Sequence, residues 1–231
     1  MKLKQIIVIA AMFMSTTAFA QFTQNGTKNQ SPVEKGWNSI YVSYNMLKYS
    51  QAAILEMWDS GYNKAYNGLS VGYDRAIALT SRLPLYIEVG GAIQYARQHI
   101  KEDDGSVNIN LLSGKIPVSV LYRWNIFGSN WSIVPKAGFD GRINIWGEEE
   151  DSYKNWKDEL EKQRYSIFKE DDGLYGEAKC SRFQVGWHIG ADIEYDSLFL
   201  GITYGADMNA FCKEIARIHF KTLTIAFGYK F

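Results

Sequence analysis

The sequence has few of the residues that bind zinc, interrupt regular secondary structure or form disulfides. Its 231 residues include 2 Cys, 3 His and 4 Pro, and the scattered His and Cys fit no zinc pattern. The 25 basic and 25 acidic residues balance, which argues against a nucleic-acid-binding surface. After residue 20, no apolar run approaches the length of a transmembrane helix. We therefore expect no metal, no other cofactor and no nucleic acid partner.

The one long apolar run lies at the start of the chain and has the order of a secretory signal. Lys2 and Lys4 precede the apolar segment 6–14, and a small-x-small pattern follows it. We expect residues 1–20 to be a signal peptide and residues 21–36, which are polar and aperiodic, to be a flexible periplasmic lead.

Large apolar and aromatic residues are plentiful, with 12 Phe, 15 Tyr and 7 Trp, and they recur at every second position. Alternation with period two is the pattern of a strand whose two faces meet different surroundings. In the last nine residues, Leu223, Ile225, Phe227, Tyr229 and Phe231 alternate with smaller or polar residues. The same alternation predicts eight strands, within 40–47, 69–79, 83–96, 115–124, 131–146, 183–195, 198–208 and 223–231.

The connections between these segments differ in length at the two ends of the predicted sheet. One end has short turns, at 80–82, 125–130 and 196–197, and the other has longer charged connections, at 47–67, 100–110, 147–180 and 209–217. Eight is the smallest common number of strands for a closed barrel in the outer membrane. We therefore expect an all-β fold over residues 37–231: an eight-stranded antiparallel transmembrane β-barrel, an up-and-down meander with short periplasmic turns and long extracellular loops.

Alternation by itself also fits a soluble barrel that buries its apolar face. Here the apolar face is too bulky for the lumen of eight strands, which side chains barely fill. The opposite face collects glycines, which suit a narrow interior: Gly72, Gly90, Gly138, Gly186, Gly190, Gly201, Gly205 and Gly228. We therefore expect the apolar face to meet lipid and the protein to lie in the outer membrane.

Four stretches carry a resemblance to a known family: LPLYIEVGGAIQY, KIPVSVLYRW, WSIVPKAGFDGRINI and LTIAFGYKF. They resemble the outer-membrane β-barrel domain family that is widespread in Bacteroidota and includes PorT-like proteins. The resemblance implies that Phe227, Tyr229 and Phe231 are read by the barrel-assembly machinery. It also suggests a subunit of a protein-secretion or assembly machine. Pro117 and Pro135 depart from ideal strand chemistry, because each removes one backbone donor.

Two turns set the expected strand registers and hence the contents of the lumen. The turn at 196–197 fixes one hairpin, and Trp124 opposite Trp131 places Lys115 opposite Asp140 in another. Buried charges require partners, so we expect a near-neutral network that plugs the lumen instead of lining a pore. Its members are Lys115, Arg123, Lys136, Arg142 and Lys230 with Asp74, Glu88, Asp140, Asp192, Glu194 and Asp207.

His188 is the main candidate for catalysis, because small outer-membrane barrels include lipid A acylases and deacylases with His, Ser and acid residues. The expected register places His188 opposite Gly205, with Asp207 diagonal to it. It places no serine beside the imidazole, since Ser181 lies a turn away. We therefore expect a structural histidine and no enzymatic activity, with a lipid A-modifying enzyme as the alternative.

Cys180 and Cys212 lie at similar heights on the loop side, in an exported chain that meets an oxidising compartment. Strict alternation aims them at opposite faces, which opposes a disulfide unless the strand ends are irregular. Whether the two cysteines form a disulfide therefore stays an open question. Such a bond would constrain the base of loop 147–180. In that acidic loop, the spacing of Trp156, Leu160 and Phe168 fits one side of a short helix.

These patterns predict an integral outer-membrane barrel without a general pore, with a structural or surface-binding role through its extracellular loops. The partners that follow are outer-membrane lipid, the barrel-assembly machinery and an unidentified surface ligand or envelope protein. The sequence does not rank a ligand-binding loop against a loop that only keeps the rim solvated.

Overall fold

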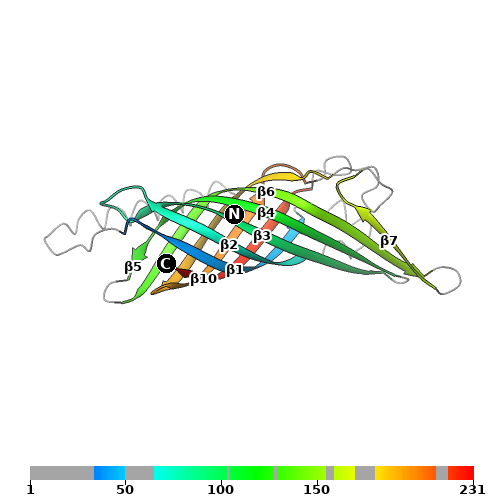
Figure 1. The fold of residues 1–231 in the computed structure, drawn as a ribbon, viewed down its shortest axis with the longest axis horizontal. Helices are drawn as coiled ribbons and strands as arrows, with labels where there is room; N and C mark the ends of the chain where they lie inside the picture. Colours follow the sequence, from blue (N-terminus) through cyan, green and yellow to red (C-terminus); the bar gives the residue numbers. More distant parts are fainter. Residues whose placement is uncertain are drawn as a thin grey trace, which may run out of the picture. The chain divides into compact units, whose positions relative to one another are not determined.

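The computed structural model describes seven segments of the chain, and their regular structure is β-strand (Figure 1). These segments are 34–49, 65–102, 105–126, 129–154, 159–169, 180–211 and 218–231. The expected signal peptide and nearly all of the expected lead lie outside them. Within these segments, no helix is long and apolar enough to cross a bilayer. The strands are β1 (Gly36–Tyr49), β2 (Tyr66–Ala78), β3 (Leu85–Glu102), β4 (Gly105–Tyr122), β5 (Trp124–Asn125), β6 (Trp131–Lys154), β7 (Leu160–Ser166), β8 (Phe183–Tyr195), β9 (Leu198–Asp207) and β10 (Phe220–Lys230).

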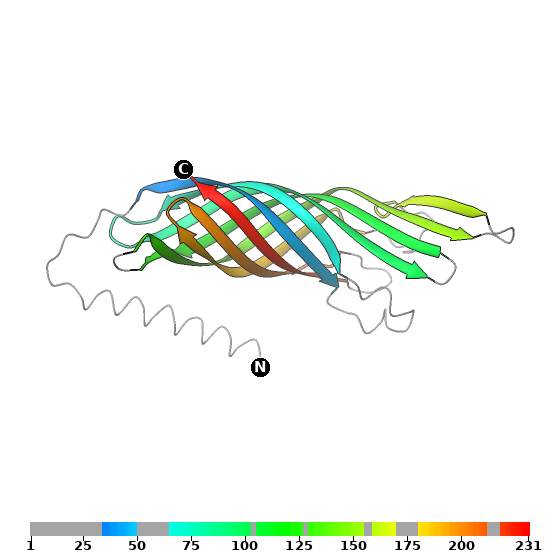
Figure 2. The same cartoon turned by 90° about the horizontal axis from the view of Figure 1, so that it is seen from below.

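Eight of these strands pair in a closed antiparallel ring (Figures 1 and 2). Its order is β1, β2, β3, β4, β6, β8, β9 and β10, and β10 pairs back onto β1. The short strands β5 and β7 are additions that pair with β6. The expected eight-stranded meander is therefore confirmed, as is the pairing of the last strand with the first.

The ring has an apolar outer face and a polar inner face, the reverse of a soluble barrel. On β2, Leu69 and Val71 are 69% and 65% exposed. Ser70, which lies between them, and Asp74, further along the strand, are each 7% exposed. The same division holds around the ring, where the exposed residues include Ile40, Val42, Val89, Ile93, Ile116, Val118, Val120, Phe139, Ile143, Ile189, Ile193, Leu200, Ile202, Ile225 and Phe227. The expectation that the apolar face points outward is confirmed.

Inward glycines give the larger interior side chains the space that they occupy. A Cβ added to Gly72 would lie 2.3 Å from Cζ of Tyr41, and one added to Gly228 would lie 2.4 Å from the ring of Phe199. In these places the lumen is full because one strand contributes no side chain.

Two registers can be compared with their expectations. The tight turn at 196–197, in which Asp196 adopts a positive φ of 52°, places His188 opposite Gly205 as expected. The pairing of Trp124 with Trp131 was wrong, because Trp124 pairs with Ile133. β5 continues the register of β4 toward the turn, so that Ile126 and not Trp124 lies opposite Trp131. The register set by the guessed aromatic pair was therefore two residues off.

The strands on one side of the ring continue beyond it as a projecting sheet of β3, β4, β6 and β7 (Figure 2). The expected loop at 100–110 is instead a hairpin, since β3 runs to Glu102 and β4 restarts at Gly105. The expected helix in 147–180 was wrong at Leu160, which begins strand β7, and Trp156 lies outside the described residues.

A β-bulge in β6 lies where the strand leaves the ring and enters the projecting sheet. Ser113 pairs with Asn144 and Leu112 pairs with Trp146, so Ile145 is the extra residue. Ile145 and Trp146 are both exposed, at 50% and 42%, although they are adjacent in sequence. The bulge therefore reverses which residues of β6 face inward beyond this point.

Apolar clusters fill the interior at both ends of the ring. At the turn end, Trp37, Ala76, Tyr86, Leu121 and Val134 pack together. The larger cluster at the loop end consists of Leu47, Tyr66, Ala96, Ile100, Val107, Ile109, Leu111, Ile167, Phe168, Cys180, Phe211, Ile218 and Phe220. Phe168, which sequence reasoning placed on a helix, belongs to this loop-end cluster.

Candidate functional site

The interior between the two apolar clusters contains buried ion pairs. Near the turn end, Arg123 Nε lies 2.9 Å from Glu194, which also contacts Lys230. Higher in the lumen, Lys136 Nζ lies 2.9 Å from Asp192. Because a buried charge without a partner is very costly, each of these pairings holds strands of the ring in register.

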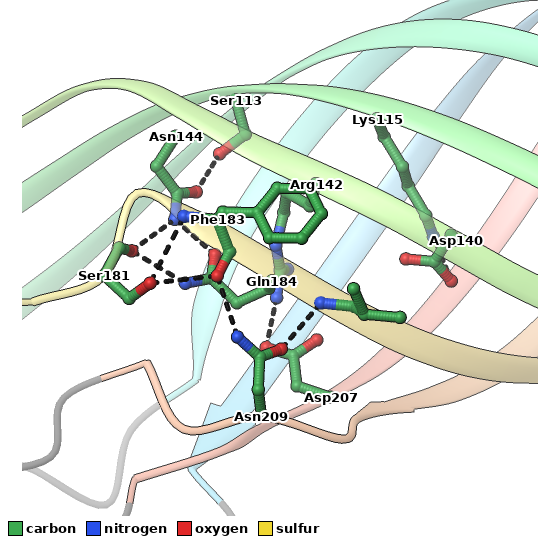
Figure 3. A network of polar contacts seen from close by, with 11 residues as sticks. Ser113, Lys115, Asp140, Arg142, Asn144, Ser181, Phe183, Gln184, Asp207 and Asn209 are labelled. Atoms are coloured by element: carbon green, nitrogen blue, oxygen red, sulfur yellow. Dashed lines mark hydrogen bonds and ion pairs between the residues drawn. The ribbon is translucent and has the colours of Figure 1, made fainter.

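Four of the other six predicted lumen charges meet on the loop side of this layer (Figure 3), and the remaining two, Asp74 and Glu88, are buried at 7% exposure each. Arg142 pairs with Asp207, and Lys115 Nζ lies 3.5 Å from Asp140. Lys115 is opposite Arg142 in the ladder, so it reaches Asp140 diagonally and not across a direct pair. The arginine also stacks its guanidinium over Phe220 at 5.3 Å, at the boundary with the loop-end cluster.

A neutral amide network lies beside these charges (Figure 3). Ser113 donates to Asn144 at 2.7 Å, and Asn144 donates to Gln184. Gln184 in turn donates to the carbonyl oxygen of Ser181 at 2.7 Å. Side chains from β4, β6 and β8 are thereby tied to one another and to the backbone that follows Cys180.

Ser119, His188 and Asp140 form a hydrogen-bonded row across three strands. His188 Nδ1 lies 3.1 Å from Asp140 Oδ1, and Nε2 lies 2.8 Å from Ser119 Oγ. A carboxylate oxygen only accepts, so Nδ1 is the donor on the aspartate side. The residues come from β4, β8 and β6 respectively, and the expectation that no serine lies beside His188 was wrong.

Gly138 is the residue that makes this row possible. In the ladders Ser119 pairs with Gly138, and Gly138 pairs with His188. The serine and the imidazole therefore meet over a position that carries no side chain. Sequence reasoning missed Ser119 because it tested only one neighbouring strand, and the inward glycine between them was the signal that could have found it.

The order serine, histidine, aspartate is that of a nucleophile, its general base and the group that orients the base. Catalysis also requires that a substrate reach the hydroxyl. Ser119 is 3% exposed, His188 4% and Asp140 9%, and apolar clusters fill the lumen above and below them. The row therefore has the connectivity of a catalytic triad. It lies inside the barrel, however, where acyl chains of the surrounding bilayer do not contact it.

A small polar cavity of about 80 Å³ adjoins this row. Small side chains on the facing wall leave the space, among them Ser39, Ser43, Ser70, Thr203, Thr224 and Ala226. Its volume suits a few water molecules and not a lipid or sugar. Among the described residues, no group of three or more His, Cys, Asp or Glu is arranged to hold a metal ion.

The remaining predicted residues lie at the two rims. Cys180 is disulfide-bonded and lies before β8 begins at Phe183, so the alternation argument against a bridge does not apply to it. Cys212 lies outside the described residues. Phe227 and Tyr229 lie on the outer face of β10, where they are 54% and 47% exposed, and Phe231 follows the strand and is 60% exposed.

No protein-family model matches the chain, and none of the curated proteins matches it. Among solved structures, it is similar to Ail, the attachment invasion locus protein of Yersinia pestis in complex with the heparin analogue sucrose octasulfate. That match has 12% identity, covers 86% of this chain and 100% of Ail, and has a TM-score of 0.45. The outer membrane enzyme PagL matches with 11% identity over 82% of this chain and 98% of its own, with a TM-score of 0.43.

Neisserial surface protein A matches with 10% identity over 86% of this chain and 98% of its own, with a TM-score of 0.39. Likenesses at these TM-scores add no weight to the fold or to a function. The fold assignment rests on the strand pairings and the exposure pattern described above.

Proposed function

We propose that the protein is an integral outer-membrane β-barrel with a plugged lumen. One observation carries the proposal: large apolar residues cover the outside of a closed ring whose inside holds paired charges. A closed barrel satisfies every backbone group without an exposed edge, which is the condition for β-structure in lipid. The secretory signal predicted from residues 1–20 supports export to that membrane.

We assign the surface role to the projecting sheet of β3, β4, β6 and β7. Its outward positions are polar and ordered in stripes, with Arg97, His99 and Lys101 on β3 and Glu148 and Glu150 on β6. Loops and extensions on a rigid barrel are common places for binding. A role in binding a surface ligand or an envelope protein therefore suits this sheet better than it suits the plugged lumen.

The two alternative functions have unequal support. A lipid A-modifying enzyme is favoured by the row of Ser119, His188 and Asp140, but that row faces inward. A subunit of a secretion or assembly machine has only the family resemblance behind it. Co-purification of a stoichiometric envelope partner in mild detergent would favour the machine subunit, and a changed lipid A mass profile after gene deletion would favour the enzyme.

The proposal is tested by the behaviour of the full chain in its native membrane. The folded barrel should stay in the membrane pellet after carbonate extraction, and boiling should change its mobility on an SDS gel. Both results follow from a closed hydrogen-bonded ring inserted in lipid. A chain that carbonate releases, with the same mobility before and after boiling, would exclude the proposed function.

A further inference from the structure

Two lysines face each other on the outside of the barrel near its loop end. Lys48 on β1 and Lys221 on β10 are direct partners in the antiparallel ladder, and both are exposed. Like charges directly opposite each other destabilise a strand pair. Among the described residues no acidic side chain offsets them: Ala206 of β9 is opposite Lys221, and Met46, the next outward residue on β1, is opposite Asn67 of β2.

Tyrosines place these lysines relative to the bilayer. Tyr44 lies four residues below Lys48 on the same strand face, is 43% exposed and donates to Asn67 at 2.5 Å. Tyr95 on β3 is 45% exposed and donates to Asn110 at 2.8 Å. Exposed tyrosines with an apolar ring and a polar partner are typical of the membrane–water interface. The lysines therefore lie at the level of the lipid headgroups, directly above the apolar belt.

A third cation lies two strands away from Lys48. Arg97 on β3 is the next outward residue beyond Tyr95, and it is separated from Met46 of β1 only by Asn67 of β2. Its exposed guanidinium donates to Asn108 at 2.6 Å and so is held in place by a neutral partner. Arg97 thus adds positive charge to the same outer side of the barrel, two strands away from Lys48, with uncharged residues between them.

We propose that Lys48 and Lys221 bind the phosphate of an anionic lipid headgroup in the outer leaflet. This inference rests on the proposed membrane location. A phosphate between the two lysines converts their repulsion into two charge-assisted contacts. A lipid is the favoured source because the cations border the apolar belt, where an acyl chain lies alongside Tyr44 and Leu223.

The test uses the purified full chain in detergent micelles, titrated with phosphatidic acid and observed by native mass spectrometry. Wild type should retain phosphatidic acid in preference to phosphatidylcholine. K48Q/K221Q should bind phosphatidic acid at least about tenfold more weakly, since each lysine near a membrane surface contributes on the order of a fivefold factor. K48R/K221R should keep the binding.

The matched control is K35Q/K169Q, which removes the same charge from two exposed lysines outside the proposed site. Equal binding by wild type and K48Q/K221Q, or equal weakening in the control, would overturn the inference. Inorganic phosphate that displaces the lipid at similar concentration would overturn the lipid as its source. If K48Q/K221Q does not fold, K221Q alone should weaken binding about fivefold.

Folding of each variant is scored separately, by its change in mobility on boiling. A variant that shows this change but binds phosphatidic acid like wild type counts against the phosphate site alone. A wild-type chain that shows no such change counts against the proposed membrane barrel itself.

Discussion

At the scale of single residues, the interior depends on charges that share partners. Asp140 contacts both Lys115, at 3.5 Å, and His188, at 3.1 Å. Glu194 likewise contacts both Arg123 and Lys230. Asp140 therefore joins the neighbouring strands β4 and β8 to β6, and Glu194 joins β10 and the link between β4 and β5 to β8. The loss of either carboxylate leaves more than one polar group without its partner.

Asp140→Ala should destabilise the barrel by about 3 kcal/mol, because Lys115 and His188 both lose a partner in a mostly buried place. The measurement is urea unfolding in lipid vesicles, followed by tryptophan fluorescence. Glu150→Ala, which removes a carboxylate from the projecting sheet, should leave the unfolding midpoint of the barrel nearly unchanged. Equal midpoints for wild type and Asp140→Ala would show that these contacts do not stabilise the fold.

Gly138→Ala tests the place where Ser119 and His188 meet. The added Cβ would lie 2.0 Å from the carbonyl oxygen of Val118 and 2.7 Å from Cα of Ser119, which are backbone atoms. We expect a loss of about 1–3 kcal/mol or failure to fold, read from the fraction of heat-shifted protein on gels. Gly91→Ala is the control, since its nearest atom lies 3.9 Å away and it should fold normally.

At the scale of elements, the projecting sheet is made by strands that continue after the ring has ended. β6 passes the bulge at Ile145 and pairs with β7, where Glu150 accepts from Arg164 at 3.0 Å and also contacts Lys162. These contacts lie on an exposed hairpin in which salt screens each pair, so cooperative pairing of the backbone carries most of its order.

The hairpin should loosen in acid. The hydrogen bond from Arg164 holds the pKa of Glu150 below its ordinary value, with Lys162 on the same strand adding to the effect. On the β4 side its neighbour is the uncharged Asn108. A lowered folded pKa stabilises the hairpin above the ordinary carboxyl pKa, and this contribution is lost as the pH falls through the folded value.

Hydrogen exchange of the β7 amides, corrected for the intrinsic effect of pH, measures this change. Protection in β7 should decrease below the ordinary carboxyl pKa, and Glu150→Gln should remove the dependence on pH. Protection in β7 that stays constant from neutral to acid pH would contradict the prediction.

At the scale of the whole molecule, the lumen is a polar layer between two apolar ends. The turn-end cluster around Trp37 and the loop-end cluster around Phe220 close the interior, and paired charges fill the space between them. Eight strands leave a lumen only wide enough for side chains. A void of about 80 Å³ lies within this arrangement.

Planar-bilayer recordings of the purified barrel should therefore show no steady conductance of the size that a porin gives. Ions would have to separate the buried pairs and displace apolar side chains at each end, and both steps are costly. A stable, porin-sized conductance from the wild-type protein would show that the lumen is open.

The sequence alone determined the features that depend on period and composition. Alternation predicted the eight strands of the ring and which side chains face inward, because neighbouring residues of a strand always point to opposite faces. The glycines predicted a narrow interior, and the two-residue turn at 196–197 predicted its hairpin. Those signals are local, and the physical rule behind each one applies wherever the strand lies.

Only the tertiary structure decided which inward residues touch. The pairing of β4 with β6 continues through β5 as far as Asn125, which places Lys115 opposite Arg142 and not Asp140, and the bulge at Ile145 reversed the faces of the rest of β6. Ser119 met His188 because two separate registers happened to place both beside Gly138. A register change of one or two residues at a turn or bulge changes the local free energy little, but it changes every cross-strand contact beyond that point. Those contacts are therefore fixed by closure of the whole ring.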